Sequence, residues 1–136
     1  MPSLVGSEMC IRDRHYLGYY YKWDPQEMYY YSVEKGNFKA APERTVGTYS
    51  KYNSIDDKID DFHFYTTGIK FGIGRASHDA SQEIRSGDIT RQEGVSLVKK
   101  FDLEYPSRFE DEIFNYLTID NKNFKNIQMV KKKQYF

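Results

Sequence analysis

The stretch from Gly68 to Gly94 holds the residues of this chain whose types and spacing could do chemistry. Gly72 and Gly74 stand directly before Arg75, and a helix is expected to begin just after them. Glycines allow close backbone approach, free N–H groups at a helix start attract anions, and an arginine adds a fork of donors. The pattern predicts a phosphate or carboxylate site, with a plain helix–helix turn as the alternative. A dinucleotide fingerprint is excluded, because Ser77 replaces the third glycine and a helix, not a strand, is expected before it.

Asp79 and Glu83 lie four residues apart, on one face of the expected helix. Paired carboxylates can hold a metal or share acid–base chemistry, although such pairs are also common on exposed helix faces. His63 and His78 are too far apart and too poorly supported by other ligands for zinc, and the single Cys10 excludes a cysteine-rich metal site. We therefore predict no metal site.

Two further segments could contact a ligand. Aromatic residues interleave with polar ones over 19–24 and again over 29–31, which suits stacking on a sugar ring or a base, or an aromatic core with wet hydroxyls. Residues 47–52 offer hydroxyls and one ammonium, which suits a polyhydroxylated or phosphorylated ligand, or a solvated surface loop.

Composition narrows the class of protein. With 136 residues, the chain can form one domain with a core, rich in its thirteen Tyr and nine Phe. Twenty basic and twenty acidic side chains cancel, so no bulk charge attracts nucleic acid or an anionic membrane. No apolar run approaches the roughly 20 residues of a membrane span, and we expect a soluble cytoplasmic protein.

The two ends are expected to lie outside the domain, which we place at 15–119. Leu4 to Arg14 resembles the translation of a transposon-type sequencing adapter, so 1–14 is expected to be a disordered artefact, with a natural leader as the alternative. Residues 120–136 are rich in Asn and Lys and carry no helix stop, which predicts a frayed or truncated tail.

Helix punctuation predicts a mostly α fold of about five short helices and one long ordered loop. The start signals are Asp24-Pro25, capping boxes at Ser54 and Thr90, Ser77, and Pro106. They predict helices over about 24–35, 54–70, 77–85, 90–101 and 106–117, with the loop over 37–53. Helical spacing predicts that the buried side chains include Ile55, Ile59, Phe62, Ile69, Val95, Leu97 or Val98, Phe101, Phe109, Ile113, Phe114 and Leu117.

Four collinear blocks carry a family resemblance that runs from about Tyr16 to Leu117. They read LGYYYKWDPQE, PERTVGTYSKYNSIDDKID, FHFYTTGIKFGIGRASHDASQEIRSGDITRQEG and KKFDLEYPSRF. Together they resemble the C-terminal half of the N-acetyl sugar amidotransferases. This family makes surface polysaccharides, lipopolysaccharide and nonulosonic acids such as pseudaminic acid.

The resemblance implies the chemistry of a PP-loop ATP pyrophosphatase. An acetamido oxygen of a nucleotide-sugar or nonulosonic-acid substrate attacks the α-phosphate of ATP, and ammonia then displaces AMP to leave an acetamidino group. ATP and Mg²⁺ are implied for the intact enzyme, and ammonia is expected from a glutaminase through a cyclase-like partner.

The chain also departs from the family pattern. It contains no Ser-Gly-Gly-x-Asp-Ser phosphate loop and no cysteine pair. We therefore expect the C-terminal helical part of a larger α/β enzyme, inactive and without cofactor when alone. The alternative is a helical docking module for the glutaminase or cyclase partner, while the neutral charge disfavours single-strand nucleic-acid binding.

The resemblance singles out positions in its blocks as candidates for binding substrate or phosphate, and it assigns no catalytic residue. We expect Lys51, Lys70 and Arg75 to face phosphates, with Asp79 orienting one of these cations. The full set of candidates is Lys22, Trp23, Asp24, Tyr49, Ser50, Lys51, Lys70, Arg75, Asp79, Arg85 and Arg91.

Overall fold

The computed structural model describes residues 15–120 and residue 124. The predictions for the leader 1–14, with its Cys10, and for nearly all of the tail 120–136 lie outside these residues. The described part contains five α-helices and a short 3-10 helix, with no strand, which confirms the mostly α fold class. The elements are η1 (Leu17–Tyr19), α2 (Pro25–Gly36), α3 (Asp60–Phe71), α4 (Arg75–Ser86), α5 (Arg91–Phe101) and α6 (Glu110–Leu117).

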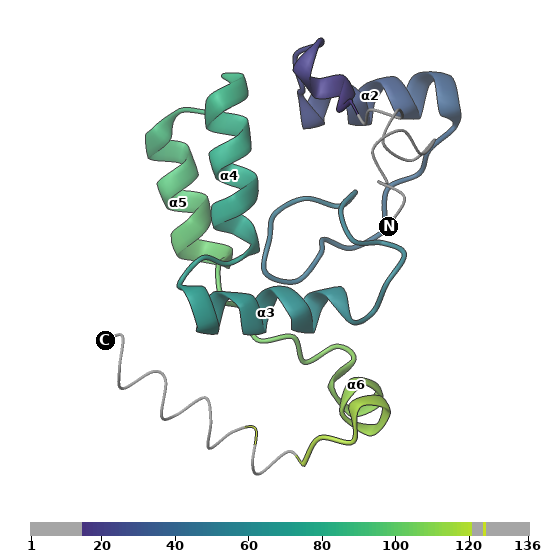
Figure 1. Ribbon diagram of the computed structural model, residues 1–136, viewed down its shortest axis with the longest axis vertical. Coiled ribbons are helices and arrows are strands. Elements are labelled where there is room, and N and C mark those ends of the chain that lie inside the picture. The colour runs from purple at the N-terminus through teal and green to yellow at the C-terminus, as the bar shows by residue number, and fades with distance from the viewer. Residues whose placement is uncertain (1–14, 121–123, 125–136) are drawn as a thin grey trace, which may run out of the picture.

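The pair formed by α4 and α5 is the main helix–helix contact of the described part. The two helices run side by side in opposite directions, and α3 crosses below them (Figure 1). Gly94 is buried in this contact, where an added Cβ would lie 2.7 Å from Ile84 Cδ1. The missing side chain at Gly94 therefore lets α5 approach α4 closely.

A small aromatic core joins α3 to α6. It consists of Phe62, Ile113 and Phe114, all less than a tenth exposed, with the rings of Phe62 and Phe114 5.5 Å apart edge to face. Phe124 packs on both rings. The predicted burial of Phe62, Ile113 and Phe114 is thus confirmed.

Several other predicted core positions are more exposed than expected. Ile59 and Phe109 pack against the core while partly exposed. Ile55, Val95 and Leu117 are 47%, 44% and 42% exposed, so the prediction of their burial was wrong.

Local caps explain where most helices begin and end. Asp24 accepts a hydrogen bond from Glu27 N at 3.2 Å and opens α2, and Thr90 forms the predicted capping box with Glu93. Gly72 and Gly87 end α3 and α4 in the left-handed conformation that favours glycine.

Three predicted helix starts were wrong by two to six residues. Ser54 has a φ of +52°, which is incompatible with the extended conformation of an N-cap, and α3 begins only at Asp60. The last helix begins at Glu110, not at Pro106. Ser77 lies inside the first turn of α4, whose N-cap is Gly74.

No helix in the part of the chain that the structure describes is long and apolar enough to cross a membrane.

The core between α3 and α6 can be tested by truncating one ring. Phe114→Ala should lower the free energy of unfolding by about 3 kcal/mol, because the large cavity that it leaves cannot fully collapse. Tyr116→Ala is the matched control on the same helix, since Tyr116 is 77% exposed, and it should change stability by less than about 0.5 kcal/mol. Urea denaturation monitored by circular dichroism measures both, and equal losses would contradict this core.

Candidate ligand-binding groove

The N-terminus of α4, the predicted anion site, is occupied by a carboxylate of the same chain. Asp102 accepts hydrogen bonds from Gly74 N at 3.3 Å, Ala76 N at 3.1 Å and Ser77 Oγ at 2.6 Å. A Cβ at Gly74 would overlap this carboxylate, so glycine is required there by the close approach. The anion at this helix start is therefore a side chain of the same chain and not a ligand.

Arg75 turns its side chain to a different partner. Its Nε lies 3.2 Å from Asp79 Oδ1, and its guanidinium carbon lies 4.1 Å from the centre of the Phe64 ring. The side chain is only 14% exposed. Arg75 is therefore an internal ion-pair partner of Asp79 and a cation–π partner of Phe64 in this structure.

Asp79 is the centre of a buried polar network between the long loop and α4. Thr48 Oγ1 donates to Asp79 Oδ2 at 2.6 Å, and Asn53 Nδ2 donates to the same oxygen at 3.4 Å. Thr48 is fully buried and Asp79 is 6% exposed. These bonds compensate the desolvation of the carboxylate and fix the loop on the helix.

Glu83 lies one turn further along α4 and is also buried, at 4% exposed. Burial raises the pKa of its carboxyl, and hydrogen bonds from Tyr49 and Gln26 act in the opposite direction. Tyr49 donates its hydroxyl to Glu83 Oε2 at 2.8 Å, and burial followed by this acceptor raises the pKa of the phenol. The alternative of an exposed acid pair at Asp79 and Glu83 is thus wrong.

Two neighbouring cavities, which we call together the Tyr52 groove, open beside this network. They share Pro25, Tyr52 and Asn53 as a common wall. The polar cavity of about 210 Å³ is further lined by Phe64, Arg75, His78, Asp79, Gln82 and Glu83. The aromatic cavity of about 230 Å³ is further lined by Trp23, Met28, Tyr29, Ser32 and Phe38.

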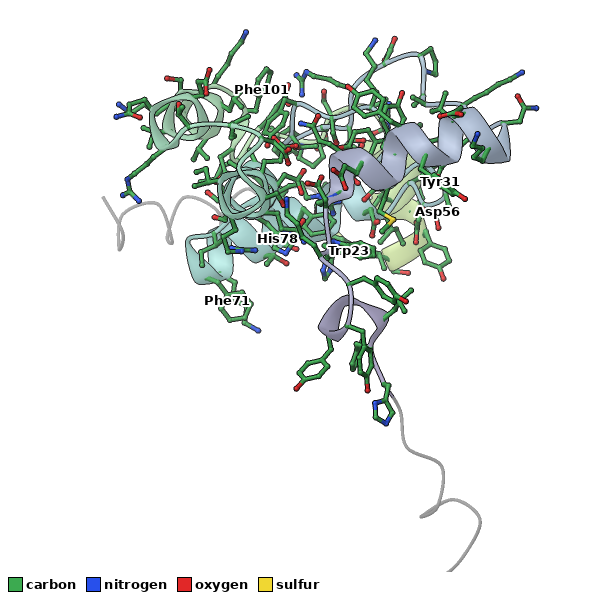
Figure 2. All side chains as sticks on the ribbon, turned by 90° about the horizontal axis from the view of Figure 1, so that it is seen from above. Trp23, Tyr31, Asp56, Phe71, His78 and Phe101 are labelled. Carbon is green, nitrogen blue, oxygen red and sulfur yellow. The ribbon has the colours of Figure 1, made fainter. Side chains whose placement is uncertain are left out.

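Aromatic rings form one half of the groove. Tyr52 stacks on Tyr29 with centroids 4.4 Å apart and planes inclined by 17°. Trp23 is 57% exposed at the open side. Trp23 lines the aromatic cavity and His78 lines the polar cavity (both are labelled in Figure 2). The groove thus offers ring faces next to buried acceptors, an arrangement suited to a polyhydroxylated ring.

Several candidate residues line the groove or brace it. Trp23, Arg75 and Asp79 line it. Tyr49 holds Glu83, and Ser50 Oγ accepts from Asn53 Nδ2 at 3.0 Å.

Asp24 and Lys22 act in the support of α2. Asp24 is 2% exposed, and its side chain forms the N-cap of that helix. Lys22 Nζ donates to Ser86 O at 3.1 Å and so connects the start of α2 with the end of α4.

The other candidate cations lie on the surface, outside the residues that line the groove. Lys51 donates to Pro42 O at 3.1 Å, and Lys70 lies 4.9 Å from the centre of the Phe71 ring. Arg85 and Arg91 are exposed. The hypothesis that Lys51, Lys70 and Arg75 face phosphates stays a prediction.

Sequence reasoning missed Tyr52, Asn53 and Gln82 as groove residues. Gln82 could have been predicted from the helical period, because it follows Asp79 by three positions and therefore lies on the same helix face. Tyr52 and Asn53 follow the candidate Lys51 directly, but the loop has no period that would orient them. Within the described residues, no group of three or more His, Cys, Asp or Glu side chains could hold a metal ion.

Comparison with known proteins identifies a family to which most of the chain is similar. A family model described as "LPS biosynthesis protein WbpG-like, C-terminal domain" matches residues 46–136, which are 91 of the 136 residues. The match includes Tyr52, Asn53 and the whole of α4, whereas Trp23 and α2 precede it. No curated protein matches the chain.

The internal cap can be tested by removing its carboxylate. Asp102→Ala should cost about 2 kcal/mol of stability, because the free N–H groups of α4 lose a charged acceptor. Sulfate should then raise the melting temperature of this variant more than that of the original protein, because the vacated helix start can bind an anion. The measurement is thermal melting in sodium sulfate against sodium chloride of equal ionic strength.

Asp88→Ala serves as the control, because Asp88 is an exposed acid just after α4. It should show neither the destabilisation nor the added sulfate response. A sulfate response of the original protein as large as that of Asp102→Ala would show that the helix start is open.

Proposed function

We propose that this chain, which belongs to the family of WbpG-like C-terminal domains of lipopolysaccharide biosynthesis proteins, supplies the sugar-binding part of an ATP-dependent N-acetyl sugar amidotransferase. The observation that carries the proposal is the Tyr52 groove, in which stacked aromatic rings adjoin buried carboxylates and side-chain amides. The family membership supports the pathway, and the resemblance of the sequence blocks supports the reaction.

The proposed reaction replaces the oxygen of an acetamido group by nitrogen. The acetamido oxygen attacks the α-phosphorus of ATP, and pyrophosphate leaves. Ammonia adds to the activated carbon, the carbon–oxygen bond breaks, and AMP departs. The amidine that remains takes up a proton and becomes a cationic acetamidinium group.

We assign ATP and its Mg²⁺ to another part of the enzyme. The helix start that could bind phosphate holds Asp102, and the guanidinium of Arg75 is engaged by Asp79. The 136 residues also lack the Ser-Gly-Gly-x-Asp-Ser loop. The start of α4 and Arg75 are therefore not free to bind ATP, and the proposed role of the groove beside them is to hold the sugar.

The groove can meet each part of an acetamido sugar. The exposed face of Trp23 can stack on the ring, and the buried carboxylates can accept hydrogen bonds from hydroxyls. The Gln82 side chain lines the polar cavity and makes no hydrogen bond to other described residues. Its amide offers both a donor and an acceptor to the acetamido group.

A second candidate function is docking to a glutaminase or cyclase-like partner that supplies ammonia. The observation that favours it is η1 with its flanking residues, which projects from the helical body (Figure 2). Tyr16 and Tyr19 there are 85% and 86% exposed. Exposed tyrosines are frequent anchors of protein interfaces.

The sugar-binding role is tested in an enzyme that carries this chain together with its nucleotide domain. Trp23→Ala should raise the KM for the acetamido sugar about tenfold, because the ring loses its stacking surface, and leave the KM for ATP unchanged. The assay follows AMP and pyrophosphate release with ammonium as the nitrogen source, and mass spectrometry of the sugar detects the exchange of oxygen for NH.

Lys99→Ala is the control, because Lys99 is exposed on α5, away from the groove. Its KM values should equal those of the original enzyme. Two results together would favour the docking role. The sugar KM of Trp23→Ala would be unchanged, and Tyr19→Ala would lose the activity that is supported by the glutaminase.

A further inference from the structure

The charges on the wall of the polar cavity do not balance. Asp79 and Glu83 are acids, Arg75 is a cation, and His78 adds charge only when protonated. Arg75 is taken up by Asp79, with Nε and Oδ1 3.2 Å apart. Glu83 is left with the neutral donors Tyr49 and Gln26.

The surroundings strengthen this imbalance. Asp79 and Asp88 both add to the burial that raises the pKa of Glu83. Burial and then the charges of Glu83 and Asp79 raise the pKa of Tyr52, on the shared wall, to about 12. The field beside Asp79 and Glu83 is thus negative, and the burial of both carboxylates limits its screening by solvent.

This negative field discriminates between the substrate and the product of the proposed reaction, an acetamido sugar and an acetamidino sugar. The acetamido group is neutral, whereas the acetamidinium group carries a positive charge spread over two nitrogens. A planar amidinium resembles a guanidinium, which pairs with a carboxylate through charge-assisted hydrogen bonds. Tyr52 and Phe64 supply apolar surface beside the carboxylates, where the methyl group of the acetamidino substituent can lie.

We infer that the Tyr52 groove binds acetamidino sugars in preference to acetamido sugars, with the Glu83 carboxylate accepting hydrogen bonds from the amidinium. The inference rests on the proposed function for the identity of the two ligands. It also orients the substrate, because a negative wall repels phosphate and the nucleotide end of a nucleotide-sugar must then point out of the groove.

The test compares two small probes on the full chain by isothermal titration calorimetry at neutral pH. The probes are methyl 2-acetamidino-2-deoxyglucoside and methyl 2-acetamido-2-deoxyglucoside. The Kd of the acetamidino sugar should be about tenfold lower, as one charge-assisted hydrogen bond suggests. Equal Kd values, or tighter binding of the acetamido sugar, would overturn the inference.

The variant Glu83→Gln assigns the preference to one carboxylate. It keeps the shape of the side chain, and it should bring the two Kd values within about twofold of each other while changing that of the acetamido sugar little. Glu34→Gln, at an exposed position on α2, is the charge-matched control and should keep the tenfold preference. A preference retained in folded Glu83→Gln would contradict the role of Glu83.

Two further outcomes separate this inference from the proposed function. If both sugars bind equally and Trp23→Ala weakens both, the sugar site stands and the charge preference fails. If neither sugar binds, the groove is not a sugar site and both ideas fail. The comparison on the original chain remains decisive even if Glu83→Gln does not fold.

Discussion

The arrangement of the candidate site depends on the burial of the Asp79 carboxylate. Residues 37–59 form no helix, so hydrogen bonds and contacts to other elements must hold this segment in place. A buried carboxylate is costly unless donors surround it, and Thr48, Asn53 and Arg75 provide them. The loop and α4 therefore need each other, since the loop supplies the donors and the helix supplies the acceptor. Tyr52 and Asn53 reach the groove as a result of this bond set.

A second charged contact holds the same loop. Arg44 makes two parallel hydrogen bonds to Glu104, at 2.6 Å and 2.5 Å, and the same carboxylate accepts from Gly47 N at 3.1 Å. Asp102, two residues before Glu104, caps α4. One short segment after α5 thus fixes both the loop and the start of α4, which supply most of the lining of the polar cavity. The scaffold uses its own carboxylates where a phosphate-binding fold would leave the donors free for a ligand.

The features that were predictable from the sequence are those set by near neighbours. Asp24 and Thr90 predict the starts of α2 and α5, because an N-cap side chain bonds to a backbone N–H only three residues away. The cap of α4 was not predictable, because Asp102 lies more than twenty residues from the N–H groups that it binds. The capping signal at Ser54 did not open a helix, because Ser54 adopts a left-handed backbone that an N-cap does not have. The groove joins Tyr29 of α2 to Tyr52 of the loop, and no spacing in the sequence indicates that pairing.

The neutral net charge of the chain and the negative charge of its groove are compatible. Twenty acidic and twenty basic side chains cancel over the whole sequence. This balance excludes only a long-range attraction of charged partners by the whole chain. Inside a cavity, a single carboxylate without a cationic partner decides the local field, because neighbouring rings exclude water and charges more than a Debye length away are screened. Glu83 is such a carboxylate, since Arg75 is committed to Asp79. The chemistry that the groove can recognise therefore follows from how charges are paired, and the composition conceals it.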